Sequence, residues 1–446
     1  MIAVAQIDRV VLVRAAMLYV PVVATVVAAL FRAPQPRLFA AALVGFFWTL
    51  PSLLALQLLN QRFEWWSFHV VGGLFRRMPI DLYLGWAVLW GILPILLFRR
   101  MAISIVATIF CCADLVLMPL CAPAVELHAH WLLGEYLAVA LVLLPALYFA
   151  RWTLEDRRLN ARATMQVMTT ASLFLFVFPE TVFALRGGGW RQLFALDGTA
   201  ASIWIQLLVL AALPSISAVQ EFATRGFGTP IPYDPPGRLV TSGVYRYVAN
   251  PMQVGCALSM GVWGVMLRNP WIALAMLGTL IYSIAVAGWD ERVDLDERFG
   301  DSWRRFRREV RDWIPCWRPY FDTQAPRPRI YIAETCGICS ELRRWLQLRN
   351  PLGLDFVAAE NHPTRSLTRV TYDPMDGAKD EHGTRAFARA LEHINLAWAL
   401  VGALMRLPIL SSIIQMLADA AGLGPKNLDY SQCSPTAGRP SGSSVH

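Results

Sequence analysis

Long apolar stretches, separated by short segments rich in arginine, fill the first two thirds of this chain. A helix needs about 20 apolar residues to cross the hydrocarbon core of a bilayer. Charged residues make up only 16% of the 446 residues, whereas soluble domains carry about 25%. We therefore predict a polytopic α-helical membrane protein with about nine spans. The predicted spans are 10–31, 38–60, 80–98, 101–122, 131–150, 165–185, 201–222, 252–268 and 270–289.

The arginines indicate how these spans are oriented. All but two of the 40 basic residues are arginine, and most follow the odd-numbered spans. The positive-inside rule then places the N-terminus outside and the C-terminal region in the cytoplasm. The segment 61–79 conflicts with this because it carries three arginines, so we expect it to lie along the interface, anchored by Trp65, Trp66 and Phe68.

The basic surplus also bears on partners and location. A net charge of +8 in a membrane protein favours contact with membrane lipids rather than nucleic acid, and no basic stripe with interleaved aromatics follows a phosphate backbone. The preference for arginine is typical of bacterial proteins from GC-rich genomes. We therefore expect an integral protein of the bacterial inner membrane.

Two polar blocks interrupt the apolar pattern near the end of the membrane region. The first reads GRLVTSGVYRYVANPMQVG at 237–255, and the second reads DERVDLDERFGDSWRRFRREVRDWIP at 290–315. The two spans between them are split only by Arg268, Asn269 and Pro270. This spacing predicts a tight helical hairpin whose open end brings the two blocks together.

The residues at that open end have the chemistry of a binding site. The residue before a proline avoids the α region, so Asn250-Pro251 marks the turn into the hairpin, and Gly255 allows close backbone approach. Tyr245, Arg246 and Asn250 would then lie near Glu291 at the cytoplasmic surface. Carboxylate, amide and aromatic groups are suited to a cationic, amino-acid-bearing cofactor. Carboxylates at a membrane edge are functional candidates.

Together the two blocks resemble the isoprenylcysteine carboxyl methyltransferases and their phospholipid methyltransferase relatives, over about residues 205–320. The resemblance implies an S-adenosylmethionine-dependent methyltransferase whose acceptor is lipophilic, an isoprenoid or another lipid. It implies a catalytic role for Glu291, at the first acid of the family's Glu-Glu pair, and for Arg246, which orients an anionic group. The implied cofactor-binding residues are Tyr245, Asn250, Pro251, Gly255 and Glu291.

Three positions depart from the family pattern. Ala249 stands where an arginine is usual, Gln253 where a tyrosine is usual, and Arg292 at the second acid. These departures leave the acceptor open and argue against assuming a prenylcysteine. They also leave a non-enzymatic alternative, a membrane scaffold with a degenerate site in which 290–315 is an amphipathic interfacial helix.

The C-terminal third has a different pattern. A strand-like run, RIYIAET, leads to Cys336-Gly337-Ile338-Cys339 and then to SELRRWLQLR, which has helical periodicity. LDFVAAE and RVTYD are typical of further strands, and 383–400 of a helix. A strand, a CxxC and a helix in this order predict a small α/β thioredoxin-like domain. A thiol at a helix N-terminus is stabilised as thiolate by the helix dipole.

Residues 329–427 resemble the DCC-type thiol-disulfide oxidoreductases, although Glu334-Thr335 replaces the usual Asp-Gly before the motif. The resemblance implies a redox role for Cys336 and Cys339 and a thiol redox partner. Packing cysteines and zinc binding are alternatives, but zinc needs two more ligands and no closely spaced histidine pair is present, so we predict no metal. A membrane-anchored thiol-disulfide oxidoreductase is thus an alternative function.

These patterns predict five regions. They are N-terminal transmembrane helices of unknown role (1–200), a methyltransferase-like membrane domain (201–320), a linker (321–328), a thioredoxin-like domain (329–428) and a disordered tail (429–446).

Overall fold

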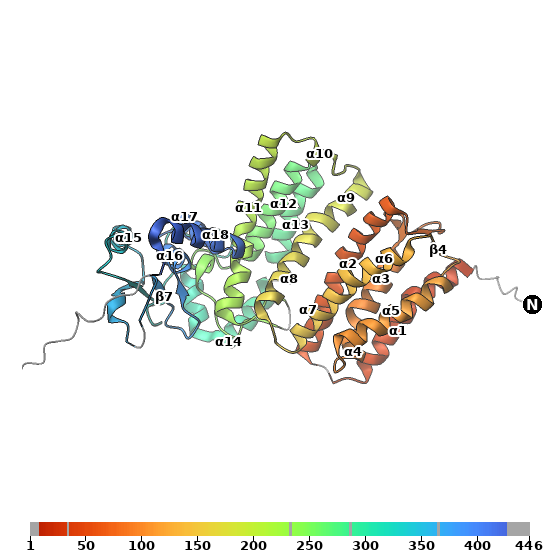
Figure 1. Cartoon of the computed structure of the whole chain (residues 1–446), viewed down its shortest axis with the longest axis horizontal. Helices are drawn as coiled ribbons and strands as arrows, with labels where there is room; N and C mark the ends of the chain where they lie inside the picture. The colour runs from red at the N-terminus through yellow and green to blue at the C-terminus, as the bar shows by residue number, and fades with distance from the viewer. Residues whose placement is uncertain (1–8, 34, 232–233, 285–287, 364–365, 426–446) are drawn as a thin grey trace, which may run out of the picture. The chain divides into compact units, whose positions relative to one another are not determined.

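The chain divides into two units (Figure 1). Unit 1 contains Met1–Val240 and Met252–Arg292, and unit 2 contains Thr241–Pro251 and Val293–His446. The computed structural model describes residues 9–33, 35–231, 234–284, 288–363 and 366–425. The predicted tail, 429–446, lies outside the described residues.

Unit 1 is built from long apolar helices, several of which contain one π-helical turn. Within the described residues, seven are long and apolar enough to cross a membrane. They are α1 (Arg9–Leu30), α2 (Pro36–Phe63), α3–η1–α4 (Ile80–Trp86, Ala87–Ile92, Leu93–Leu97), α5 (Ile103–Leu120), α6–η2–α7 (Trp131–Ala138, Val139–Leu143, Leu144–Leu154), α8–η3–α9 (Leu159–Ser172, Leu173–Val177, Phe178–Arg186) and α11–η4 (Gly198–Glu221, Phe222–Gly226). A short helix, α10 (Arg191–Phe194), precedes the last of these. The first seven predicted spans are therefore confirmed as helices.

The predicted hairpin is present, but its helices are shorter than full spans. They are α12 (Pro251–Met266) and α13 (Pro270–Tyr282), which reach about 24 Å and about 20 Å at about 1.5 Å per residue. The break falls at the predicted place because Asn269 caps α13, its side chain accepting hydrogen bonds from the next backbone amides. A Cβ added at Gly264 would lie 2.2 Å from the nitrogen of Ala273, so the two helices touch through their backbones.

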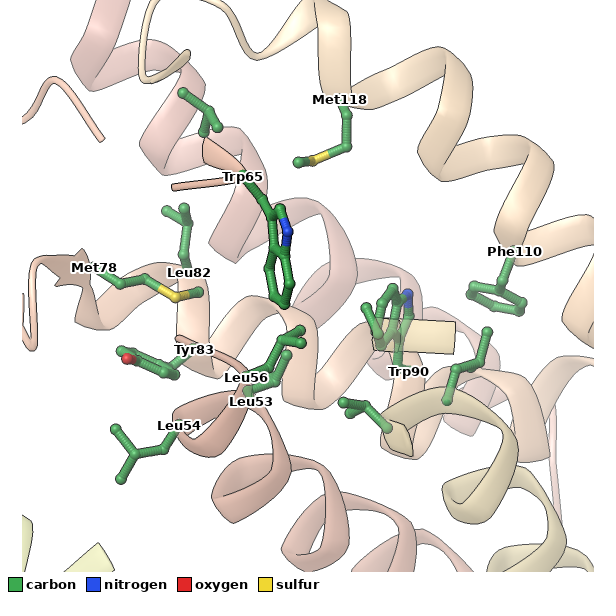
Figure 2. Packing of buried hydrophobic residues seen from close by; sticks show 14 of the residues in the cluster. Leu53, Leu54, Leu56, Trp65, Met78, Leu82, Tyr83, Trp90, Phe110 and Met118 are labelled. Atoms are coloured by element: carbon green, nitrogen blue, oxygen red, sulfur yellow. The ribbon is translucent and has the colours of Figure 1, made fainter. Parts of the chain in front are cut away.

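Small residues let the helices of unit 1 approach closely. A Cβ at Gly45 in α2 would lie 2.2 Å from the carbonyl oxygen of Gly91 in η1, and one at Gly85 would lie 2.1 Å from that of Met17. Such contacts are typical of helices packed within membranes. Figure 2 shows the largest cluster of buried side chains in this unit, with Trp65 pointing inward. Trp65 is 3% exposed, so its predicted role as an interfacial anchor is wrong.

The segment 64–79 folds back on unit 1. Its first strand, β1 (Trp66–Phe68), pairs antiparallel with β4 (Val125–Leu127), and β2 (Leu74–Phe75) pairs with β3 (Met78–Pro79). Arg76 forms an ion pair with the buried Glu180. One of the arginines that conflicted with the predicted orientation is therefore neutralised inside the unit.

Unit 2 contains a four-stranded sheet in the order β6-β5-β7-β8. The strands β5 (Arg329–Ile332) and β6 (Asp355–Ala358) are parallel and joined by α15 (Gly337–Gln347), while β7 (Thr371–Asp373) and β8 (Glu381–His382) run antiparallel. A 3₁₀ turn, η7 (Ala359–Asn361), follows β6. The three predicted strands and the helix after the CxxC are found, and β8 was missed because it is only two residues long.

Further helices complete unit 2 (Figure 1). The predicted helix over 383–400 is instead two helices, α16 (Thr384–Leu391) and α17 (Leu396–Met405), because Asn395 starts a new helix by capping the amide of Trp398. The helices α18 (Pro408–Ala418) and η8 (Asp419–Leu423) follow, bent by 87° from α17. The amphipathic α14 (Gly288–Glu309) begins in unit 1 and continues into unit 2, with a break at Gly300.

Candidate functional site

The first polar block is held by backbone bonds inside unit 2. Its 3₁₀ turn, η5 (Gly243–Arg246), begins at Gly243, whose φ of 60° favours glycine. Arg246 accepts from the amide of Tyr320 at 2.8 Å, and Tyr247 accepts from that of Cys316 at 2.8 Å. Asn250 donates to the backbone and the side chain of Asp312, at 3.2 Å each. Residues 245–250 are therefore fixed against the chain that follows α14.

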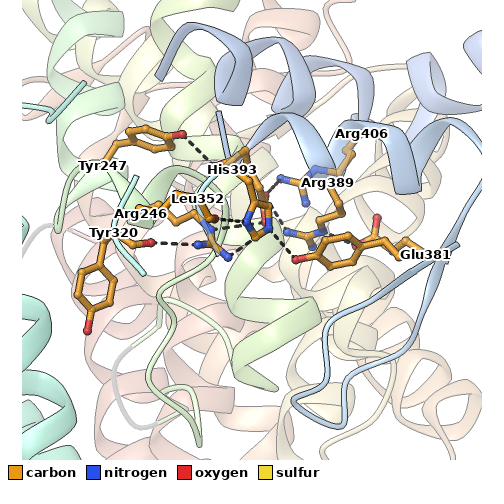
Figure 3. Close-up of polar contacts among 10 residues, drawn as sticks. Arg246, Tyr247, Tyr320, Leu352, Glu381, Arg389, His393 and Arg406 are labelled. Carbon is orange, nitrogen blue, oxygen red and sulfur yellow. Dashed lines mark hydrogen bonds and ion pairs between the residues drawn. The ribbon is translucent and has the colours of Figure 1, made fainter. Parts of the chain in front are cut away.

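Arg246 lies in a buried polar network with the turn between α16 and α17 (Figure 3). Its guanidinium donates to the carbonyl of Tyr320 at 3.0 Å, lies 3.4 Å from Nε2 of His393, and lies 3.9 Å from a carboxylate oxygen of Glu392. The neighbouring Tyr247 donates its hydroxyl to the carbonyl of Glu392 at 2.8 Å. Burial raises the pKa of this phenol above its ordinary value.

Glu392 balances several arginines in this network. Its carboxylate lies 3.2 Å from Arg389 and 3.6 Å from Arg406, and Arg389 also pairs with Glu381 at 2.5 Å. The side chains of Glu392, Arg389 and Arg406 are each at most 2% exposed. A buried carboxylate among arginines is strongly held, because removal of either partner leaves an uncompensated charge.

His393 has a defined tautomer in this network. Nδ1 lies 2.8 Å from the carbonyl of Leu352, which can only accept, so Nδ1 carries the proton. Nε2 then accepts from the hydroxyl of Tyr372 at 3.0 Å and from Arg246.

The predicted methyltransferase residues thus divide between the two units. Tyr245, Arg246 and Asn250 belong to unit 2, where the first two are each 6% exposed. Gly255 belongs to unit 1, where a Cβ would lie 2.4 Å from the hydroxyl of Ser215, so its missing side chain serves the packing of α12 on α11. Glu291 belongs to α14, but its side chain lies outside the described residues.

Sequence reasoning missed the partners of Arg246. Nothing in the spacing of Glu392 and His393, more than 140 residues away in the chain, linked them to the first block. Tyr247 could have been noticed, since it follows Arg246 in the same polar run. Only the fold brings these side chains together.

The CxxC pair lies where the sequence predicted it. Cys336 is the N-cap residue of α15, and Cys339 lies one turn into the helix. Glu360 holds the preceding turn, accepting from the amides of Glu334 at 3.0 Å and Thr335 at 3.2 Å and from the Thr335 hydroxyl at 2.9 Å. Desolvation raises the pKa of Glu360, but these hydrogen bonds outweigh it and leave the pKa below its ordinary value.

A mostly apolar cavity of about 230 Å³ opens beside the two cysteines. Its lining comes from α15, the segment before β7, α16, and the helices after α17. Cys336, Ile338, Cys339, Leu367, Phe387 and Leu423 are among its walls. No cluster of three or more His, Cys, Asp or Glu that could hold a metal ion is found in the part of the chain that the structure describes.

One segment of the chain matches a known protein family. Residues 195–302 match the phospholipid methyltransferase family. The matched stretch runs through α11 and the hairpin into α14, so it contains the first polar block and the start of the second, and it ends before the CxxC. No curated protein and no solved structure matches the chain.

Proposed function

We propose that this protein is a membrane-embedded, S-adenosylmethionine-dependent methyltransferase that acts on a lipophilic acceptor. The observation that carries the proposal is the match of residues 195–302 to the phospholipid methyltransferase family, together with the seven candidate spans found among the described residues. The proposed setting is the bacterial inner membrane, with the N-terminus outside and the CxxC region in the cytoplasm. An isoprenoid or lipid acceptor would reach the site from the bilayer.

Unit 1 offers polar groups that suit a cofactor at the start of α12. One small cluster joins Ala163 of α8, Val219 of α11 and Met252 of α12, so these three helix ends meet. Close by in sequence, Gln166 on α8 is 6% exposed and Ser217 on α11 is fully buried. Among the described residues, neither the Gln166 amide nor the Ser217 hydroxyl has a hydrogen-bond partner. Buried polar groups are rarely left without hydrogen-bond partners. The unpaired state of these two groups therefore favours a polar ligand that would bind to them.

When bound, S-adenosylmethionine supplies an electrophilic methyl group, and the chain's own task is to align it with the acceptor. By resemblance, Tyr245, Asn250, Pro251 and Gly255 line the cofactor site. Glu291 is proposed to contact the cofactor or the acceptor.

Arg246 has a different role in this proposal. Its guanidinium is already engaged by Tyr320, His393 and Glu392. We assign it to positioning residues 245–250 rather than to holding an anionic group of the substrate, the role that the resemblance implies.

Calorimetry of S-adenosylmethionine binding to the full-length protein in detergent tests this function. Micromolar binding is expected in the wild type and should be lost in Glu291→Gln and Asn250→Ala. Gln166→Leu should weaken it, whereas Gln206→Leu, an exposed position on α11, should not. A folded wild type without affinity for the cofactor would refute the methyltransferase assignment and favour a scaffold with a degenerate site.

Unit 2 supports a second candidate activity, thiol-disulfide exchange by a thioredoxin-like domain. The sheet order and the helix that crosses between two parallel strands support this fold. Cys336 at the helix N-cap is suited to attack a disulfide in an apolar partner, forming a mixed disulfide and releasing one thiolate of that partner. Cys339 would then displace the second thiolate, leaving a Cys336–Cys339 disulfide.

Reduction of a small disulfide probe by the full-length protein, after prior reduction with dithiothreitol, tests that activity. Cys336→Ser should abolish reduction of the probe and leave S-adenosylmethionine binding intact. Cys316→Ser, a cysteine outside the pair in the same unit, is the matched control. Equal activity of Cys336→Ser and wild type would exclude this role for the pair.

A further inference from the structure

Two acidic side chains lie inside the helices of unit 1 without a basic partner. Asp114 on α5 is 4% exposed and Glu135 on α6 is 6% exposed. Among the described residues no ion pair reaches either carboxylate, and Asp114 Oδ2 and Glu135 Oε1 each lack a hydrogen-bond partner. The two groups lie within electrostatic range of each other. Burying a carboxylate without compensation is strongly unfavourable, which points to a missing positive partner.

Glu135 faces a small cavity with aromatic walls. The cavity measures about 40 Å³, and the indoles of Trp66, Trp86 and Trp90 line it together with Met118. A single water needs about 10–15 Å³ measured in this way, so the space holds more than one water-sized group. The indole of Trp90, a residue 2% exposed, also interacts with Asp114.

The aromatic wall is fixed by its surroundings. The side-chain oxygen of Asn60 accepts from the amides of Trp65 and Trp66 at 3.0 Å each, and its nitrogen donates to the Trp66 carbonyl at 2.9 Å. A Cβ at Gly134 would lie 2.4 Å from the Trp66 ring, so the indole packs directly against α6 beside Glu135. These contacts therefore fix the shape of the cavity at this end of unit 1.

We propose that this cavity is a site for a small ammonium-type cation, held by the Glu135 carboxylate and the surrounding indoles. Aromatic faces attract organic cations, and Asp114 adds a second negative group nearby. The lining does not suit a metal ion, because no cluster of three His, Cys, Asp or Glu is present among the described residues. The volume suits a small cation of a few non-hydrogen atoms, such as methylammonium.

This inference is independent of the methyltransferase proposal, and its test does not use enzymatic activity. The thermal unfolding of the full-length protein in detergent is measured at constant ionic strength with methylammonium, ammonium, potassium or sodium chloride. A ligand that binds only the folded state raises the unfolding temperature with concentration. Methylammonium and ammonium are expected to raise it above the value in sodium or potassium, saturably.

The variants locate the effect. Glu135→Gln is expected to remove the difference between salts, and Trp86→Leu should weaken the apparent affinity on the order of tenfold. Glu126→Gln, an exposed carboxylate on β4, should leave it unchanged. Identical unfolding temperatures in all four salts, or an ammonium effect that survives in Glu135→Gln, would overturn the proposal. If Glu135→Gln does not fold, the wild type and Trp86→Leu decide.

Discussion

Replacing Glu392 with glutamine removes the negative charge from the centre of the buried network in unit 2. Glutamine keeps the size of the side chain and one carbonyl acceptor. The guanidinium groups of Arg389, Arg406 and Arg246 lie 3.2, 3.6 and 3.9 Å from the present carboxylate. Arg389 keeps its pair with Glu381, so the loss falls mainly on the other two arginines.

The burial of these groups sets the size of the effect. The three arginine side chains are 7% exposed or less and Glu392 is 2% exposed. Water therefore cannot reach the arginines to compensate for the lost negative charge. Breaking a buried pair by removing one partner costs about 3–5 kcal/mol. Because whole domains are stable by only about 5–15 kcal/mol, we expect Glu392→Gln to destabilise unit 2 severely.

Amide hydrogen exchange of the detergent-purified protein is the suitable assay, since a two-unit chain need not unfold in one step. The protection of residues 246–249 and 392–394 should fall by the equivalent of about 3 kcal/mol or more. Glu334→Gln is the matched control, because the Glu334 side chain is 59% exposed in its pair with Arg343 and such pairs contribute about 0–1 kcal/mol. Similar protection in both variants would refute the reasoning that this network holds the first polar block.

Three further predictions follow from packing, hydrogen bonding and charge. Gly45→Ala should separate α2 from η1, since its Cβ would lie 2.2 Å from the carbonyl of Gly91. Thermal unfolding should show that stability falls by about 1–3 kcal/mol. Gly278→Ala is the control and should change stability little, because a Cβ there meets no neighbouring group within 4 Å. Tyr247→Phe leaves a buried carbonyl without its donor and should cost unit 2 about 1–3 kcal/mol by amide exchange, so an unchanged exchange rate would contradict the burial argument. The pKa of Glu360 is lowered, so the stabilisation that its carboxylate gives to the turn before the CxxC is complete above pH 4.5, the ordinary pKa. This stabilisation is lost as the pH falls through the folded-state pKa. Amide exchange at that turn should therefore accelerate in acid in the wild type, and Glu360→Gln should remove this pH dependence.

Much of the architecture follows from the sequence because its signals are local. Runs of about 20 apolar residues define the long helices. Asn269 and Pro270 fix the break of the hairpin because capping and proline geometry act within a few residues. The CxxC lies at a helix N-terminus because the strand before it and the helical periodicity after it are both contiguous.

Tertiary structure decides which of the buried charges have a partner of opposite charge. Glu180 and Asp114 are both acidic residues in apolar helices, yet Glu180 meets Arg76 from a distant loop and Asp114 has no such partner among the described residues. From its own motif alone, Arg246 is predicted to be a substrate-binding residue. The α16–α17 turn, far along the chain, instead engages it as part of the interior. Periodicity and capping depend on neighbours in sequence, whereas the neutralisation of a charge depends on which distant backbone folds against it.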